Sequence, residues 1–162
     1  MSKKSFFLVL APLEQAFCNN YEGEIVYLGN KNFNSLKNLN NSSKKITKKN
    51  SHWHNKENLI QDNNYLEDLE KRFFDKFYKS LNNTLKVSYP KKYWEIFLGR
   101  IIVQIIYVLY ERWQTLNNIK NKHELTETKI LKKIDNILIF QNGSELIQNI
   151  ANSDLLNFEI NS

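Results

Sequence analysis

The segment YWEIFLGRIIVQIIYVLYERW, residues 93–113, decides the fold class of this chain. It is apolar almost throughout, and its polar exceptions recur at helical spacing. They follow the steps i, i+4, i+7 and i+11 and so share one stripe of a helix: Arg100, Gln104, Tyr107 and Glu111. A helix that is apolar on its other faces is usually buried in a sizeable protein or in a membrane. We therefore expect the central helix of a core, in which a buried Arg100 needs a polar partner.

The apolar segments favour a cytoplasmic protein over an exported or membrane-spanning one. Residues 6–13 resemble a short signal peptide, but the run is broken by Pro12. A membrane-spanning helix needs about 20 apolar residues, and Arg100 would lie in the middle of a span at 94–110. Cys18 is the only cysteine, so the chain can form neither an internal disulfide nor a zinc site built from cysteines.

The order of apolar patterns predicts a helix-rich α/β domain. Two short runs of strand-forming residues, 6–10 and 24–28, read as buried strands. From Asn58 the apolar residues recur every three or four positions, which predicts an amphipathic helix of about seven turns. Pro90 then interrupts the chain and begins a second long helix over residues 91–121.

The remaining segments give weaker patterns. Residues 30–51 are rich in Asn, Ser and Lys and predict a long mobile loop. Residues 125–134 read as a short basic helix, and residues 136–140 fit either a strand or a buried helix. A final helix over 145–152 follows a turn, with Ser144 in a position to cap it. A parallel α/β sheet usually has more strands, each followed by its helix, so two strands followed by long helices indicate an incomplete α/β domain.

The positive charge of the chain is concentrated in its Asn- and Lys-rich part. The net charge is +6, and the stretch between Glu24 and Glu57 contains seven lysines and no acidic residue. Nucleic-acid sites usually combine arginines with aromatic residues on one ordered face, whereas these lysines lie among Asn and Ser. We expect no nucleic-acid partner, and at most weak attraction to an anionic membrane surface.

Two residues near the predicted strands are candidates for catalysis. The chain contains no GxGxxG, GxxxxGK[ST], HExxH or GxSxG motif. Glu14 follows the first strand directly, where the carboxyl ends of strands in open α/β sheets meet the ligand. His52 is a candidate neutral donor or general base, although a loop that only docks Trp53 in the core explains this segment as well. His52 and His54 lack nearby acidic or cysteine ligands, so we expect no metal.

The charged residues of the central segment allow two interpretations. The stripe of Arg100, Gln104 and Glu111 can form an internal ion pair that bridges packed elements, and Arg112 lies one position off this stripe. Alternatively Arg100 binds an anion, because a guanidinium group suits phosphate or carboxylate. Spacing and composition do not decide between a structural and a substrate-binding role.

Several short motifs, in order along the chain, resemble the N-terminal region of a family of transferases from bacterial surface-polysaccharide and O-antigen gene clusters. The resemblance covers most of the chain apart from the Asn- and Lys-rich stretch. The matching positions are Leu13-Glu14, Leu28-Gly29, His52-Trp53, Tyr93-Trp94, Glu111-Arg112-Trp113 and Ser153-Asp154 with Asn157. The chain departs from the family pattern at Phe17, His54 and Arg100, where the family suggests tryptophan, an acid and proline.

The resemblance implies the fold and activity of a glycosyltransferase-like enzyme. The expected fold is an incomplete Rossmann-like N-terminal domain over residues 1–162, with two short strands and two long helices. The expected reaction is transfer of a sugar from a nucleotide-sugar donor to a carbohydrate acceptor, with no separate cofactor. Glu14 and His52 would contact the acceptor or act as base, and Glu111 and Arg112 would organise the site. Arg100 is the weakest of the substrate-binding candidates.

Family members are several times longer, and their C-terminal half resembles enzymes that handle nucleotide-activated sugars. We therefore expect this chain to be the acceptor-side part, inactive without a nucleotide-sugar domain, and cytoplasmic or peripheral to the inner membrane. The alternative is a non-catalytic helical interaction domain, in which residues 93–113 form a partner interface. The sequence does not indicate an oligomeric state.

Overall fold

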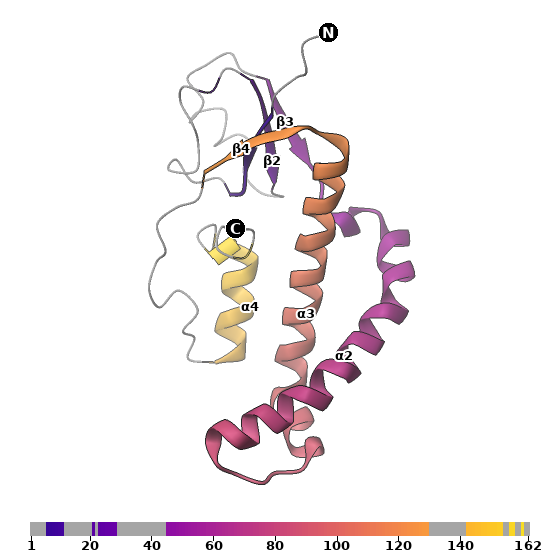
Figure 1. The fold of residues 1–162 in the computed structure, drawn as a ribbon, viewed down its shortest axis with the longest axis vertical. Helices are drawn as coiled ribbons and strands as arrows, with labels where there is room; N and C mark the ends of the chain where they lie inside the picture. Colours follow the sequence, from indigo (N-terminus) through magenta and orange to yellow (C-terminus); the bar gives the residue numbers. More distant parts are fainter. Residues whose placement is uncertain are drawn as a thin grey trace. The chain divides into compact units, whose positions relative to one another are not determined.

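The computed structural model describes residues 6–11, 21, 23–28, 45–129, 142–153, 156, 157 and 160 (Figure 1). The chain divides into two compact units, which are described separately. The first, called the sheet unit, comprises Met1–His52 and Arg112–Ser162. The second, called the hairpin unit, is Trp53–Glu111.

The described part of the sheet unit contains a four-stranded parallel sheet. Its strands are β1 (Phe6–Val9), β2 (Glu24–Leu28), β3 (Ile46–Lys49) and β4 (Leu125–Thr128), in the spatial order β3-β2-β1-β4. Strands β1 and β2 confirm the two predicted buried strands, and nearly all of their residues are buried. The prediction of a helix-rich α/β fold is therefore correct at this level.

Two strands contradict the sequence-based predictions. Strand β3 lies inside the predicted mobile loop 30–51, where Ile46 pairs with Ile25 of β2. Strand β4 occupies the start of the predicted helix 125–134. Thr126 and Thr128 donate their hydroxyl protons to the backbone oxygens of β1, and threonine favours strands over helices. Pairing with distant strands outweighed the local pattern in both cases.

The core of the sheet unit forms where helix α3 (Lys91–Lys122) covers the central strands. Ile119 of α3 is buried in this cluster, and Leu116 packs against it. The strand side chains in the cluster come mainly from β1 and β2, because these strands have a neighbour on each side. The buried residues are Phe7, Leu8, Val9, Leu10, Ala11, Tyr21, Ile25, Val26, Tyr27, Leu28 and Ile119.

The hairpin unit consists of helix α2 (Lys56–Leu85) and the N-terminal part of α3. Asn55 caps α2 by accepting a hydrogen bond from the backbone N–H of Glu57. The helix ends at Lys86, which has the left-handed backbone conformation, with φ at 54°. The predicted long helices and the break before Pro90 are therefore confirmed.

The prediction that residues 93–113 form a helix buried on most faces is wrong. Ile102 and Ile106 are buried against Leu66 and Phe74 of α2, but Ile96 is 76% exposed. A single neighbouring helix covers only one side of this segment, so its other apolar side chains stay accessible. Among the described residues α3 is long and apolar enough to cross a membrane, a criterion that core helices of soluble proteins also meet.

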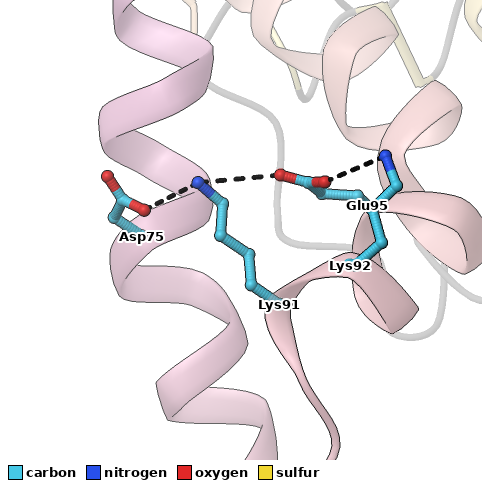
Figure 2. A network of polar contacts seen from close by, with 4 residues as sticks. All are labelled: Asp75, Lys91, Lys92 and Glu95. Carbon is cyan, nitrogen blue, oxygen red and sulfur yellow. Dashed lines mark hydrogen bonds and ion pairs between the residues drawn. The ribbon is translucent and has the colours of Figure 1, made fainter.

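A network of charged side chains joins the start of α3 to α2 within the hairpin unit (Figure 2). Lys91 contacts Asp75 of α2 at 2.7 Å and Glu95 at 3.6 Å, and Lys92 contacts the same Glu95. Hydrogen bonding to Lys91 lowers the pKa of Asp75, and the same contact raises the pKa of Lys91. Asp75 and Lys92 are exposed and Lys91 and Glu95 are half-buried, so solvent screens the attraction and the network contributes little to stability.

Helix α4 (Gly143–Asn152) confirms the predicted C-terminal helix. Its cap is Asn142, whose side chain accepts a hydrogen bond from the backbone N–H of Glu145 at 2.9 Å. The prediction that Ser144 caps this helix is therefore wrong. The predicted strand at 136–140 lies outside the described residues.

Candidate functional site

The candidate site lies in the sheet unit, at the carboxyl edge of the sheet. All four strands are parallel, so their carboxyl ends meet at one edge. After β3 the chain continues through Asn50 and Ser51 into a single turn of 3₁₀-helix at His52–His54. His52 therefore follows the carboxyl end of a strand by three residues.

Helix α3 brings further polar side chains to this edge. Strand β4 begins three residues after α3 ends, so the last turns of α3 run back along the sheet toward the amino ends of the strands. Ile119 lies over the core, and the turn that contains Thr115 is one turn nearer to the carboxyl edge. Thr115 is only 3% exposed. Its hydroxyl oxygen accepts a hydrogen bond of 2.7 Å from the backbone N–H of His52.

The imidazole ring of His52 is held by a second residue of α3. The side-chain amide nitrogen of Asn118 lies 3.0 Å from Nδ1 of His52. With the amide in this orientation Asn118 donates and Nδ1 accepts, so the proton of the neutral ring is on Nε2. This arrangement suits His52 to donate a hydrogen bond through Nε2, which is the first of the two roles predicted from the sequence.

Arg112 connects α3 to the C-terminal segment of the chain. Its Nη2 donates a hydrogen bond of 3.2 Å to the side-chain oxygen of Asn157. The amide nitrogen of Asn157 in turn donates to the backbone oxygens of Ile150 and Ser153, at 3.0 and 2.9 Å. Ser153 also caps the next turn, because its hydroxyl oxygen accepts from the backbone N–H of Leu156. Asn157 is thus anchored on three sides and fixes the guanidinium group.

The described part of the sheet unit does not contain the other candidates from the sequence. Glu14 lies outside the described residues. Arg100 is exposed and belongs to the hairpin unit, so the expectation of a buried Arg100 with a polar partner is wrong. Glu111 is buried, with 8% of its surface exposed, and it also belongs to the hairpin unit. His52 and Arg112 are thus the candidates from the sequence that the structure describes within the sheet unit.

The neighbours of His52 in sequence have a structural role. Trp53 donates a hydrogen bond from Nε1 to Asp62 at 2.9 Å and packs against the core of the hairpin unit. His54 is exposed. The described residues contain no group of three or more His, Cys, Asp or Glu side chains arranged to hold a metal ion.

Sequence reasoning missed Thr115 and Asn118. Both lie on α3 just beyond Arg112, at steps of three residues, so the helical spacing alone placed them near one another. Nothing in the spacing indicated that the loop after β3 would pack against this turn. That contact joins positions 63 and 66 residues apart in the chain.

A comparison with protein families gives one match. A sequence model described as LIC12162 family transferase matches residues 6–162. The chain belongs to the LIC12162 family of transferases. No curated protein and no solved structure matches it.

In this LIC12162 family chain, two of the motifs that suggested a transferase meet in space. Arg112 comes from the Glu111-Arg112-Trp113 motif at the end of the apolar segment, and Asn157 comes from the Ser153 to Asn157 motif. The hydrogen bond between them joins positions 45 residues apart. Trp113 of the same motif is exposed.

Proposed function

We propose that this chain is the acceptor-side part of a glycosyltransferase-like enzyme that acts in surface-polysaccharide or O-antigen assembly. The reaction is the transfer of a sugar from a nucleotide-sugar donor to a carbohydrate acceptor. The donor binds to a second α/β domain that the described residues do not supply, and transfer by this chain requires that domain. The enzyme works in the cytoplasm, next to the membrane where surface polysaccharides begin.

Membership of a transferase family supports the reaction class, and the strand order supports a Rossmann-like fold. The order β3-β2-β1-β4, with all strands parallel, is the order of the first four strands in doubly wound nucleotide-binding folds. In such sheets the strand order reverses beside the first strand, and ligands bind outside the carboxyl ends at that point. In this chain the reversal falls between β1 and β4.

The observation that carries the proposal is the support of His52, which follows the carboxyl end of β3, by two residues of α3. The bond from Thr115 fixes the backbone of His52, and Asn118 leaves Nε2 as the donor. A neutral imidazole N–H of this kind binds a sugar hydroxyl without a charge. Arg112 lies three residues before Thr115 on α3 and is held by Asn157. Its guanidinium group supplies a cation for an anionic group of the acceptor or donor.

The proposal is tested by an activity measurement on this chain together with a nucleotide-sugar-binding domain supplied as a second polypeptide. We expect calorimetric binding of a nucleotide sugar to the pair, and sugar transfer to a carbohydrate acceptor. His52→Phe should lower the rate by roughly 100-fold or more, the range of a lost catalytic hydrogen bond. His52→Gln keeps a donor and should lose less.

His54→Gln is the matched control, because His54 is exposed and lies two residues away in the same turn. Each variant is also checked for unchanged urea unfolding. Absence of binding and transfer with a folded pair would contradict the proposal. Equal losses in His52→Gln and His52→Phe would contradict the donor role and favour a general base.

A further inference from the structure

The hairpin unit exposes an apolar surface at the start of α3. Ile96 is 76% exposed and Phe97 67% exposed, and Tyr89 and Tyr93 are also exposed. Residues 93, 96 and 97 follow the steps i, i+3 and i+4, so they lie on one face of the helix. Large contiguous apolar patches are rare on monomeric soluble proteins and often mark a site of interaction.

The aromatic rings of this surface form an ordered row. The rings of Tyr89 and Tyr93 stack with centroids 4.3 Å apart, and Tyr93 stacks with Phe97 at 6.1 Å. The backbone of Tyr89 is held by Asn82 of α2, because its N–H and C=O both form hydrogen bonds with the side chain of Asn82. We call this row with Ile96 the tip surface. Stacking holds its three rings against one another.

Exposed cations lie at both ends of the stretch that carries the tip surface. Between Leu85 and Arg100 the chain carries four basic residues and one acidic residue. Lys86 and Arg100 are exposed at either end, and position 100 continues the i, i+7 step from Tyr93 on the same helix face. Lys91 and Lys92 are paired with Glu95 and with Asp75 of α2, as Figure 2 shows, so Lys86 and Arg100 supply the charge of the rim. The rim therefore presents positive charge to any partner.

We infer that the tip surface docks the protein onto the surface of a membrane that contains anionic lipids. Exposed Ile and Phe side chains enter the boundary between headgroups and acyl chains, and tyrosine rings favour that boundary. Lys86 and Arg100 attract the anionic headgroups. In a two-fold dimer formed through the tip surface, the cations of one copy would instead face those of the other, and like charges repel. The tip surface lies at and just after the turn between α2 and α3 (Figure 1). This turn is in the middle of the hairpin unit's sequence, far from residues 53 and 111, where the unit joins the rest of the chain.

This inference does not rest on the transferase chemistry, and a binding measurement tests it. Vesicles of phosphatidylcholine mixed with phosphatidylglycerol should capture the full chain on flotation, and vesicles of phosphatidylcholine alone should capture less. Ile96→Glu and Phe97→Glu should each weaken binding to the mixed vesicles roughly tenfold or more. Arg100→Gln should weaken it less, and high salt should release the protein.

Ile60→Glu is the matched control, because Ile60 is 73% exposed on α2 and lies outside the tip surface. It should bind like the unchanged chain. Equal loss in Ile60→Glu, or no binding by the unchanged chain, would overturn the inference. So would self-association that Ile96→Glu abolishes, which would show a second copy as the partner. Protein that resists high salt and needs detergent for release would show a spanning segment and would also overturn it.

Discussion

At the scale of single residues, the candidate site depends on side chains that hold other groups in place. Thr115 is nearly inaccessible and uses its hydroxyl to satisfy the backbone N–H of His52. The side-chain oxygen of Asn157 accepts a hydrogen bond from Arg112, and its amide nitrogen donates to two backbone oxygens. Buried polar groups of this kind must be paired, since an unpaired one costs stability.

Replacing Thr115 by valine tests this dependence. Valine keeps the shape of threonine but cannot accept a hydrogen bond, so the backbone N–H of His52 loses its partner. We expect the free energy of unfolding to fall by about 1–3 kcal/mol, measured by urea unfolding. Thr84→Val, at an exposed position of α2, is the control. A Thr115→Val variant as stable as Thr84→Val would show that water replaces the bond.

His123 makes the stability of the sheet unit dependent on pH. Its Nε2 is buried without a hydrogen-bond partner, and its ring packs edge-on to Phe6 with centroids 4.7 Å apart. Burial lowers the pKa of His123 below 6.5, and the ammonium group of Lys49 lowers it further, against a smaller opposing effect of Glu24. The folded protein thus favours the neutral ring.

The free energy of unfolding of the sheet unit should therefore fall in acid, because His123 becomes protonated. Above pH 6.5 the ring is neutral in both states, and its contribution to stability is complete. As the pH falls through that value, His123 is protonated in the unfolded chain before it is protonated in the folded protein. Stability therefore decreases until the pH is below the pKa of His123 in the folded protein. Urea midpoints at about pH 7.5 and about pH 5.5 should differ more for the unchanged chain than for His123→Gln. Equal differences would contradict a buried neutral His123.

At the scale of elements, local sequence patterns were sufficient for the helices. The three- and four-residue steps after Asn58 and the position of Pro90 gave both long helices within a few residues of their observed bounds. Helices contain their own hydrogen bonds, so their pattern is local. The strands β3 and β4 were missed because strand pairing depends on partners far away in sequence.

The turn between α2 and α3 depends on Asn82. Its side-chain oxygen accepts from the indole Nε1 of Trp94 at 2.9 Å and from the backbone N–H of Tyr89, and its amide nitrogen donates to the backbone oxygen of Tyr89. Asn82→Ala should therefore lower the free energy of unfolding by about 1–3 kcal/mol.

Asn83→Ala serves as the control, because Asn83 is the next residue of the same helix and is exposed. Urea unfolding of both variants provides the comparison. Similar small effects in the two variants would mean that the turn is fixed by packing around the buried Trp94 and not by the amide.

At the scale of the whole molecule, stability should be uneven across the described sheet. β1 and β2 are the interior strands, and Val9 and Val26 are fully buried. Most residues of β4 are exposed. We expect backbone amides of β1 and β2 to exchange with deuterium more slowly than those of β3 and β4, because the interior strands open only with the core. Peptide-resolved mass spectrometry measures this, and faster exchange in β1 than in β4 would contradict the topology.

Sequence alone determined the helix-rich α/β class, the strands β1 and β2, the two long helices with their turn, and the resemblance to a transferase family that the match over residues 6–162 bears out. Only the tertiary structure decided that residues 46–49 and 125–128 are strands, and that His52 meets Thr115 while Arg112 meets Asn157. It also decided which face of the segment 93–113 stays exposed. Hydrophobic periodicity records how each segment can bury itself, but the partner that covers it is set by contacts between distant parts of the chain.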